Sequence, residues 1–173
     1  DLKPANIMVG DFGQVYLMDW GLAKLIRSQP ASGKGALMNA PGAVGTPDYM
    51  APEQARGDRQ ITAAADVFSL GCVLYECLTG RAPFVSASVV ETLRMISNDD
   101  PLPPRRLQAT IPRDLETICL HCLHKQPSKR YASAQALADD LRHFLLREPI
   151  MARRTPMLEK TWMKARRHPT AAL

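Results

Sequence analysis

The first 21 residues hold a group of side chains suited to binding a divalent cation. Asn6 offers an amide oxygen, and Asp11 and Asp19 each begin a short Asp-aromatic-Gly sequence. Carboxylate and amide oxygens are ligands that Mg²⁺ prefers in proteins. The way the chain folds between the two aspartates decides which of them can share an ion with Asn6.

Two β-prone runs, at residues 7–9 and 15–18, flank the turn-rich sequence Gly-Asp-Phe-Gly-Gln. This pattern predicts an antiparallel hairpin. We place its tip between Phe12 and Gly13. The expected pairs are then Val9 with Tyr16, Met8 with Leu17, Ile7 with Met18 and Asn6 with Asp19.

This register selects one of the two aspartates. Opposed residues of an antiparallel ladder lie roughly 5 Å apart, which is close enough for Asn6 and Asp19 to share an ion. Asp11 would lie at the hairpin tip, about 15 Å from Asn6 at roughly 3.3 Å per residue. We therefore predict a metal site at Asn6 and Asp19, and a turn at Asp11-Phe12-Gly13.

The rest of the chain reads as a long loop followed by helices. Residues 28–47 are rich in Gly, Pro and Ser, and loops of that length are usually functional or disordered. Residues 67–78 are apolar nearly all round, which predicts a buried helix that stops at Gly80. Further helices are expected over residues 87–96, around an amphipathic stripe at 115–123, and after Ser133 as an N-cap. The apolar face of the last helix is expected to hold Leu137, Leu141, Phe144 and Leu145.

Composition and charge narrow the class of protein. The chain has 173 residues, 46% of them hydrophobic, which is enough for one ordinary core. The net charge is +5, yet residues 1–146 balance 15 basic against 15 acidic side chains, whereas residues 147–173 hold seven basic and two acidic. A neutral body with few aromatic residues argues against nucleic-acid binding and places the excess charge in a basic tail. Because the chain begins within a motif, we expect it to be a fragment of a longer polypeptide.

The four cysteines lie in apolar runs, which suits free thiols in a reducing compartment. The sequence Cys-Leu-His-Cys-Leu-His at residues 119–124 invites a zinc site. On a helix, however, Cys119 and Cys122 lie on the apolar stripe while His121 and His124 point the other way, and no second ligand pair occurs at zinc-finger spacing. We therefore expect core cysteines and no zinc.

Five motifs, taken together, resemble those of eukaryotic-like Ser/Thr protein kinases. Their residues are similar to those of the bacterial receptor-type members of this family. The motifs are DLKPAN (1–6), DWG (19–21), GTPDYMAPE (45–53), DVFSLG (66–71) and KQPSKRYASA (125–134). The match covers residues 1–147 and implies an α+β protein-kinase-like fold. This would be a mostly helical C-terminal lobe with a short β-hairpin at the catalytic loop, with the N-terminal lobe missing. Residues 148–173 would form a basic, juxtamembrane-like tail.

The resemblance implies a catalytic role for three residues. Asp1 matches the aspartate that orients the substrate hydroxyl and accepts its proton. Lys3 matches the lysine that contacts the γ-phosphate of ATP, and Thr46 resembles the threonine that lies beside both and favours Ser/Thr substrates. Phosphoryl transfer asks mainly for positioning and charge neutralisation, which suits such a set.

The resemblance also implies that ATP and Mg²⁺ are the cofactors. Asn6 and Asp19 match the pair that holds Mg²⁺ against the phosphates, and Lys3 joins them in binding the nucleotide. Trp20 stands where the family has Phe in its metal motif. That residue packs rather than coordinates in the family, so the exchange leaves the ligands intact and puts the packing of the loop in doubt.

Three residues resemble structural supports of the family. Glu53 resembles a glutamate that pairs with a buried arginine, and Arg130 stands at the partner's position. Asp66 resembles the aspartate that anchors the catalytic-loop backbone, although an acidic group at a helix N-terminus is favoured in any case. Ser28 and Ser32 lie in the activation loop and are candidate phosphorylation sites, but a flexible loop has the same composition.

The implied function is a Ser/Thr protein kinase that transfers the γ-phosphate of ATP to protein hydroxyls in signalling. The alternative is a pseudokinase that serves as a binding scaffold. A small-molecule kinase fits poorly, because Thr46 and residues 51–53 belong to a platform for protein substrates. This fragment, lacking the Gly-rich loop and the ATP-anchoring lysine, is expected to be inactive alone.

The expected partners are protein substrates and no nucleic acid, and the class is compatible with a homodimer. Basic residues around Trp162, followed by an apolar start at residues 170–173, favour a juxtamembrane segment. The alternative is a solvated linker helix. A transmembrane segment after residue 173 would place the enzyme at the cytoplasmic face of a membrane. A polar continuation would instead make it cytoplasmic.

Overall fold

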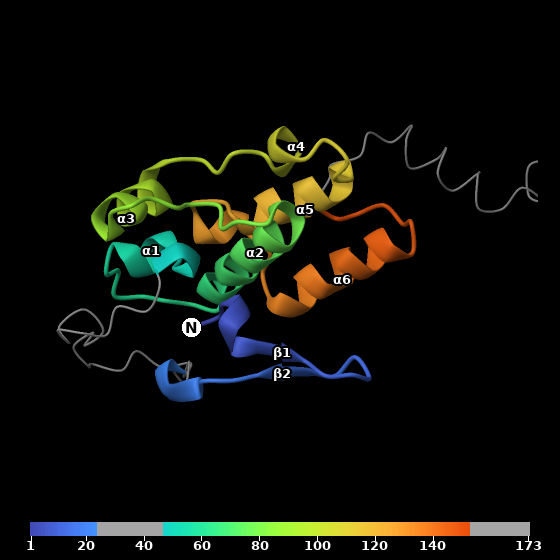
Figure 1. Cartoon of the computed structure of the whole chain (residues 1–173), viewed down its shortest axis with the longest axis horizontal. Coiled ribbons are helices and arrows are strands. Elements are labelled where there is room, and N and C mark those ends of the chain that lie inside the picture. Colours follow the sequence, from blue (N-terminus) through green and yellow to red (C-terminus); the bar gives the residue numbers. More distant parts are fainter. Residues whose placement is uncertain (24–46, 153–173) are drawn as a thin grey trace, which may run out of the picture.

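The computed structural model describes residues 1–23 and 47–152. This part of the chain is a helical body with a two-stranded antiparallel hairpin along one side (Figure 1). The elements are η1 (Pro4–Asn6), β1 (Ile7–Val9), β2 (Val15–Leu17), η2 (Trp20–Leu22), η3 (Pro47–Tyr49), α1 (Pro52–Ala55), α2 (Ala64–Thr79), α3 (Val89–Asn98), α4 (Pro104–Leu107), α5 (Arg113–Cys122), η4 (Pro127–Lys129) and α6 (Ala134–Leu145). The predicted fold class, a mostly helical lobe with a short hairpin, is confirmed.

The hairpin forms where it was predicted, but its register is shifted by one residue. The observed pairs are Ile7 with Leu17, Met8 with Tyr16 and Val9 with Val15. Beyond the ladder, the Met18 N–H donates to the Asn6 carbonyl oxygen at 2.8 Å. The predicted pairs Val9–Tyr16, Met8–Leu17, Ile7–Met18 and Asn6–Asp19 are therefore wrong.

The turn explains this shift. The Gly10 N–H donates to the Gln14 carbonyl oxygen at 2.8 Å, which leaves three loop residues instead of two. Gly13 closes the loop with a positive φ of 81°. A left-handed glycine as the last residue of a three-residue loop is a common hairpin connection. Asp11 lies in this turn, as predicted.

Helix α2 is the centre of the helical body and contacts α4, α5, α6, η3 and η4. Its buried side chains include Val67, Phe68, Cys72 and Tyr75, which confirms the predicted buried helix. Gly80 caps it with φ 77°. A Cβ added at Gly71 would lie 2.5 Å from Cys122 Cβ, so α2 and α5 cross too closely there for any side chain.

The remaining predicted helices are present, with ends that differ by a few residues. Ser133 caps α6 by accepting from the Ala136 N–H at 3.1 Å, as predicted. The expected inward position of Leu145 is wrong, because this side chain is 77% exposed. Leu145 is eight residues after Leu137, which places it about 80° around the helix.

The buried cysteines confirm the expected core positions on α5. Cys119 and Cys122 are fully buried, as is Cys72 on α2, and all four cysteines of the chain are free thiols. Cys119 packs in one core cluster with Phe68 and Ile96, whereas Cys122 packs in a second with Ile118. Both clusters include residues of α2, so this helix joins them.

The chain after α6 returns to the body. Ile150 is 3% exposed and belongs to the second core cluster. Asp140 of α6 is fully buried and accepts hydrogen bonds from the Met151 and Ala152 N–H groups and, at 2.7 Å, from the Tyr131 hydroxyl. The domain boundary after residue 147 stays a prediction, but the packed chain continues at least to Ala152.

Within residues 1–23 and 47–152, none of the helices combines the length and the apolar character needed to cross a bilayer.

Candidate active site

The structure brings Asp1, Lys3 and Asn6 together at the start of the chain. Lys3 Nζ lies 2.7 Å from Asp1 Oδ2. The Asn6 side-chain amide donates to the Asp1 backbone carbonyl at 2.8 Å. Asn6 is 7% exposed, whereas the Asp1 and Lys3 side chains are each 20% exposed. One buried amide thus holds the backbone beneath an ion pair that solvent can reach.

Pro4 explains the local shape of this cluster. A residue before proline is confined to extended conformations, and Lys3 adopts φ −151° and ψ 159°. Pro4 then starts η1 as its first residue, and the Asn6 N–H closes the turn on the Lys3 carbonyl at 2.9 Å. The tight turn directs Asn6 back toward Asp1.

Asp19 stands at the end of the hairpin in an unusual backbone conformation. It adopts φ 55° and ψ 71°, a left-handed conformation that is uncommon outside glycine and that marks functional or strained positions. Its Oδ1 accepts from the Gly21 N–H at 3.4 Å, and a Cβ at Gly21 would lie 3.3 Å from the same oxygen. Gly21 therefore leaves room for the carboxylate beside the backbone.

The side chains of Asn6 and Asp19 fit a magnesium ion by their chemistry. The Asn6 amide nitrogen is used by the Asp1 carbonyl, which leaves the amide oxygen as a possible ligand. Asp19 follows Met18, whose N–H donates to the Asn6 carbonyl, so the shifted register still leaves the two residues at the same open end of the hairpin, just outside β1 and β2. Both offer the oxygen donors that Mg²⁺ prefers.

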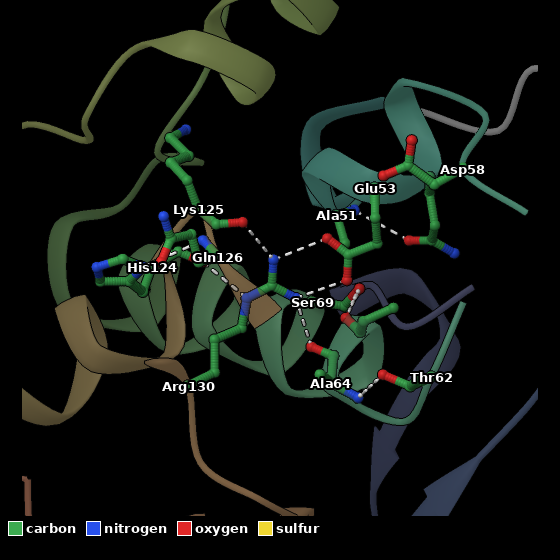
Figure 2. A network of polar contacts seen from close by, with 12 residues as sticks. Ala51, Glu53, Asp58, Thr62, Ala64, Ser69, His124, Lys125, Gln126 and Arg130 are labelled. Carbon is green, nitrogen blue, oxygen red and sulfur yellow. Dashed lines mark hydrogen bonds and ion pairs between the residues drawn. The ribbon is translucent and has the colours of Figure 1, made fainter. Parts of the chain in front are cut away.

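Glu53 and Arg130 form the buried ion pair that the sequence led us to expect (Figure 2). The guanidinium binds both carboxylate oxygens at 2.7 Å. Its other three N–H groups donate to the backbone carbonyls of Ala64, His124 and Lys125. All five donors are satisfied, which offsets the cost of burying the two charges. The pair joins α1 to the segment after α5.

Some of the other predicted site residues lie outside the part of the chain that the structure describes. Asp66 lies exposed in the first turn of α2, and its role as a backbone anchor stays a prediction. Thr46, Ser28 and Ser32 lie outside the described residues, as does the tail after Ala152 that carries Trp162.

Sequence reasoning missed a set of contacts around Tyr49, which follows the Thr46–Pro47 sequence. The Tyr49 hydroxyl donates to the Glu76 carboxylate, and the Ser69 hydroxyl donates to the Tyr49 carbonyl at 2.8 Å. Burial and the Glu76 hydrogen bond raise the pKa of Tyr49, and burial followed by the Glu76 charge raises that of Asp48. Two polar residues in the apolar α2 sequence, Ser69 and Glu76, were the available signal.

Known proteins share extended sequence similarity with this chain. The protein kinase domain family matches residues 1–141. The chain is 41% identical over 141 residues to the serine/threonine-protein kinase PknB of Mycobacterium leprae and 40% identical to that of Mycolicibacterium smegmatis. It is 42% identical to PknB of Mycobacterium tuberculosis (strain H37Rv). Each alignment covers 82% of this chain and 22% of the relative.

The chain therefore spans about a fifth of the length of these curated relatives. The family match itself covers well over half of the chain and includes the Asp1–Lys3–Asn6 cluster, the hairpin, Asp19 and the Glu53–Arg130 pair. This chain belongs to the protein kinase domain family.

Proposed function

We propose that the protein is a Ser/Thr protein kinase and that this chain contributes the catalytic loop and the metal-binding aspartate. The observation that carries the proposal is the joint placement of Asp1, Lys3 and Asn6 on one turn. Its support comes from bacterial Ser/Thr protein kinases that are about 41% identical over this region. The substrates would be proteins with exposed Ser or Thr hydroxyl groups.

The residues divide the chemistry between them. Bound ATP would supply the γ-phosphoryl group, and the Mg²⁺ bound with it would neutralise the charge of the phosphates. Asn6 and Asp19 would hold the ion through their oxygens, and Lys3 would place its ammonium beside the transferred group. Asp1 would orient the substrate hydroxyl and accept its proton. The Asp1–Lys3 ion pair keeps both charges in place and within reach of solvent.

The activity is tested by phosphate transfer from labelled ATP to a Ser/Thr peptide library by the full-length protein with Mg²⁺. Asp19→Asn and Asp1→Asn should each lower the rate by at least about 100-fold, since positioned acid–base and charged groups contribute this much or more. Asp11→Asn is the matched control. It removes a carboxylate from the hairpin turn and should leave the rate within about twofold.

The scaffold alternative predicts a different result. A pseudokinase would transfer no phosphate, and the Asp19→Asn and Asp11→Asn variants would then be indistinguishable by activity. Equal loss of activity in both variants would contradict the assignment of the metal site to Asp19. Calorimetric titration of Mg²⁺–ATP, compared between these two variants, separates loss of binding from loss of transfer.

Three finer predictions belong to this proposal. Attachment to a membrane through a segment after residue 173 would place the catalytic body at the cytoplasmic face. Pairing of two copies would form a homodimer. Phosphorylation of Ser28 or Ser32 would order the activation segment, and mass spectrometry of the active protein that finds both serines unmodified would rule it out.

A further inference from the structure

Lys125 is held by three groups at once. Its Nζ donates to the Ile96 carbonyl at 2.6 Å and to the Met95 carbonyl at 3.3 Å, and it lies 4.0 Å from the centroid of the Phe84 ring. The two carbonyls belong to the last turn of α3. The Met95 carbonyl also accepts from the Asp99 N–H at 2.9 Å, and carbonyls at a helix C-terminus carry a partial negative charge that attracts cations. The ammonium therefore fastens the end of α3.

The same segment of chain carries the Arg130 clamp. Arg130 lies 5.0 Å from the Phe68 ring, which stacks on Phe84 with centroids 6.4 Å apart. The guanidinium also donates to the Lys125 carbonyl at 3.1 Å. Figure 2 shows Lys125 and Arg130 on one side and Glu53 across from them. Each of the two stacked rings therefore has one of the two cations against it.

Arg130 and Lys125 each hold a different helix, and these two helices contact each other. Arg130 binds Glu53 of α1, and Lys125 binds the end of α3. Helix α3 contacts both α1 and η3, and η3 carries Asp48 and Tyr49, directly after the Thr46–Pro47 sequence. The kinase resemblance implies that Thr46 and residues 51–53 face protein substrates, and η3 and α1 follow or include these residues. We therefore extend the name platform to η3, α1 and α3 together.

We propose that Lys125 is a positioning residue for the protein substrate, which it serves by fixing the end of α3 against the rest of the platform. The proposal rests on the kinase function proposed above. Its basis is that α3 lies against η3 and α1 while its last turn is tied to Lys125. Loss of the ammonium should loosen the platform and leave the Asp1–Lys3–Asn6 cluster unchanged.

The surroundings of Lys125 argue against stability as the main purpose of this contact. Burial lowers its pKa to about 8, an effect only partly opposed by the charges of Asp99 and Asp100 and reinforced by Arg130. Folding therefore makes the ammonium harder to keep charged. A methionine would fill the same space without that cost. The hydrogen bonds from the ammonium to the Met95 and Ile96 carbonyls therefore explain the charged side chain better than stability does.

Steady-state kinetics of the full-length protein test this proposal with three variants. Lys125→Met should raise the KM for the protein substrate about fivefold, within the range found for residues that couple sites through packing. The kcat and the KM for ATP should stay within about twofold, because they depend on the Asp1–Lys3–Asn6 cluster and on nucleotide binding rather than on the end of α3. Lys125→Arg keeps a cation over the ring and should restore the substrate KM. Lys129→Met removes an exposed lysine from the same segment and is the matched control.

Hydrogen exchange provides a readout that does not depend on activity. In Lys125→Met, amides at residues 95–99 should exchange faster than in Lys129→Met, with the core of α2 unchanged. Unchanged exchange there, or a parallel fall of kcat and both affinities with a lower melting temperature, would overturn the proposal. A wild-type protein that transfers no phosphate would instead refute the kinase function, while the exchange of α3 would still decide whether Lys125 holds it.

Discussion

Two ion pairs of this chain, Asp1–Lys3 and the predicted Glu53–Arg130, are built in opposite ways. Asp1 and Lys3 share one 2.7 Å contact, and a fifth of each side chain is exposed. Glu53 and Arg130 share two such contacts, with side-chain exposures of 4% and 0%, and Arg130 has no unused donor. The first pair can change partners while solvent still screens its charges, whereas the second cannot separate without leaving a buried charge unpaired. The difference agrees with the roles proposed for them, a catalytic pair and a structural clamp.

Breaking the clamp should have the largest effect on stability. Glu53→Ala leaves a buried guanidinium without its carboxylate, and removing one partner of such a pair costs about 3–5 kcal/mol. Urea denaturation should show the loss in the free energy of unfolding. Replacing Glu53 and Arg130 together by apolar residues should cost less than the sum of the single changes. Strict additivity of the two losses would show that the pair is not coupled.

Asp140 offers a third case beside the two ion pairs, because it is a buried carboxylate held mainly by neutral donors. Burial raises its pKa, but hydrogen bonds from the Tyr131 hydroxyl and the Met151 and Ala152 N–H groups outweigh that and lower it. Asp140→Ala should cost about 1–3 kcal/mol by stranding buried donors, as measured by urea denaturation. Tyr131→Phe should cost less, because it leaves the two backbone bonds in place.

The lowered pKa of Asp140 also predicts that the stability of the fold depends on pH in acid. Since the folded pKa of Asp140 lies below the ordinary value of 3.8, its stabilisation is present above that value and is lost as pH falls through the folded pKa. Acid titration of the wild-type protein, followed by circular dichroism, should therefore show a steeper loss of stability below pH 3.8 than titration of Asp140→Ala. Parallel curves would contradict this.

Breaking the exposed pair should hardly change stability but should stop catalysis. Lys3→Met should change the free energy of unfolding by less than about 1 kcal/mol, as exposed pairs generally do. Phosphate transfer by the full-length protein should nevertheless fall steeply. A variant that unfolds as readily as Glu53→Ala would show that the two pairs do not differ in the way proposed.

The smallest expected effect is a pH slope from Lys125. Because burial lowers its pKa from the ordinary 10.5 to about 8, the unfolded chain binds this proton more tightly than the folded one. The free energy of unfolding should therefore rise as pH increases from 8 to 10.5, by much less than the full pKa shift implies because solvent screens this half-buried group. Urea denaturation across this range should show the rise in the wild-type protein and in Lys129→Met, and lose it in Lys125→Met.

Local sequence was enough to predict the parts of the molecule in which neighbours in the chain are also neighbours in space. The hairpin, the buried α2, the Ser133 cap and the αL glycine after α2 each depend on a few consecutive residues. The same locality placed Asp11 in a turn and brought Lys3 and Asn6 to one turn of chain. The motif pattern supplied the pairing of Glu53 with Arg130, which are 77 residues apart.

Tertiary structure decided what depends on exact turn geometry and on how helices cross. The hairpin register followed from a left-handed Gly13 that composition alone does not reveal. The contacts of Tyr49 with Glu76 and of Lys125 with Ile96 join residues 27 and 29 positions apart. No periodicity in the sequence encodes such contacts, because they arise only when α2, α3 and the segment after α5 pack around one core.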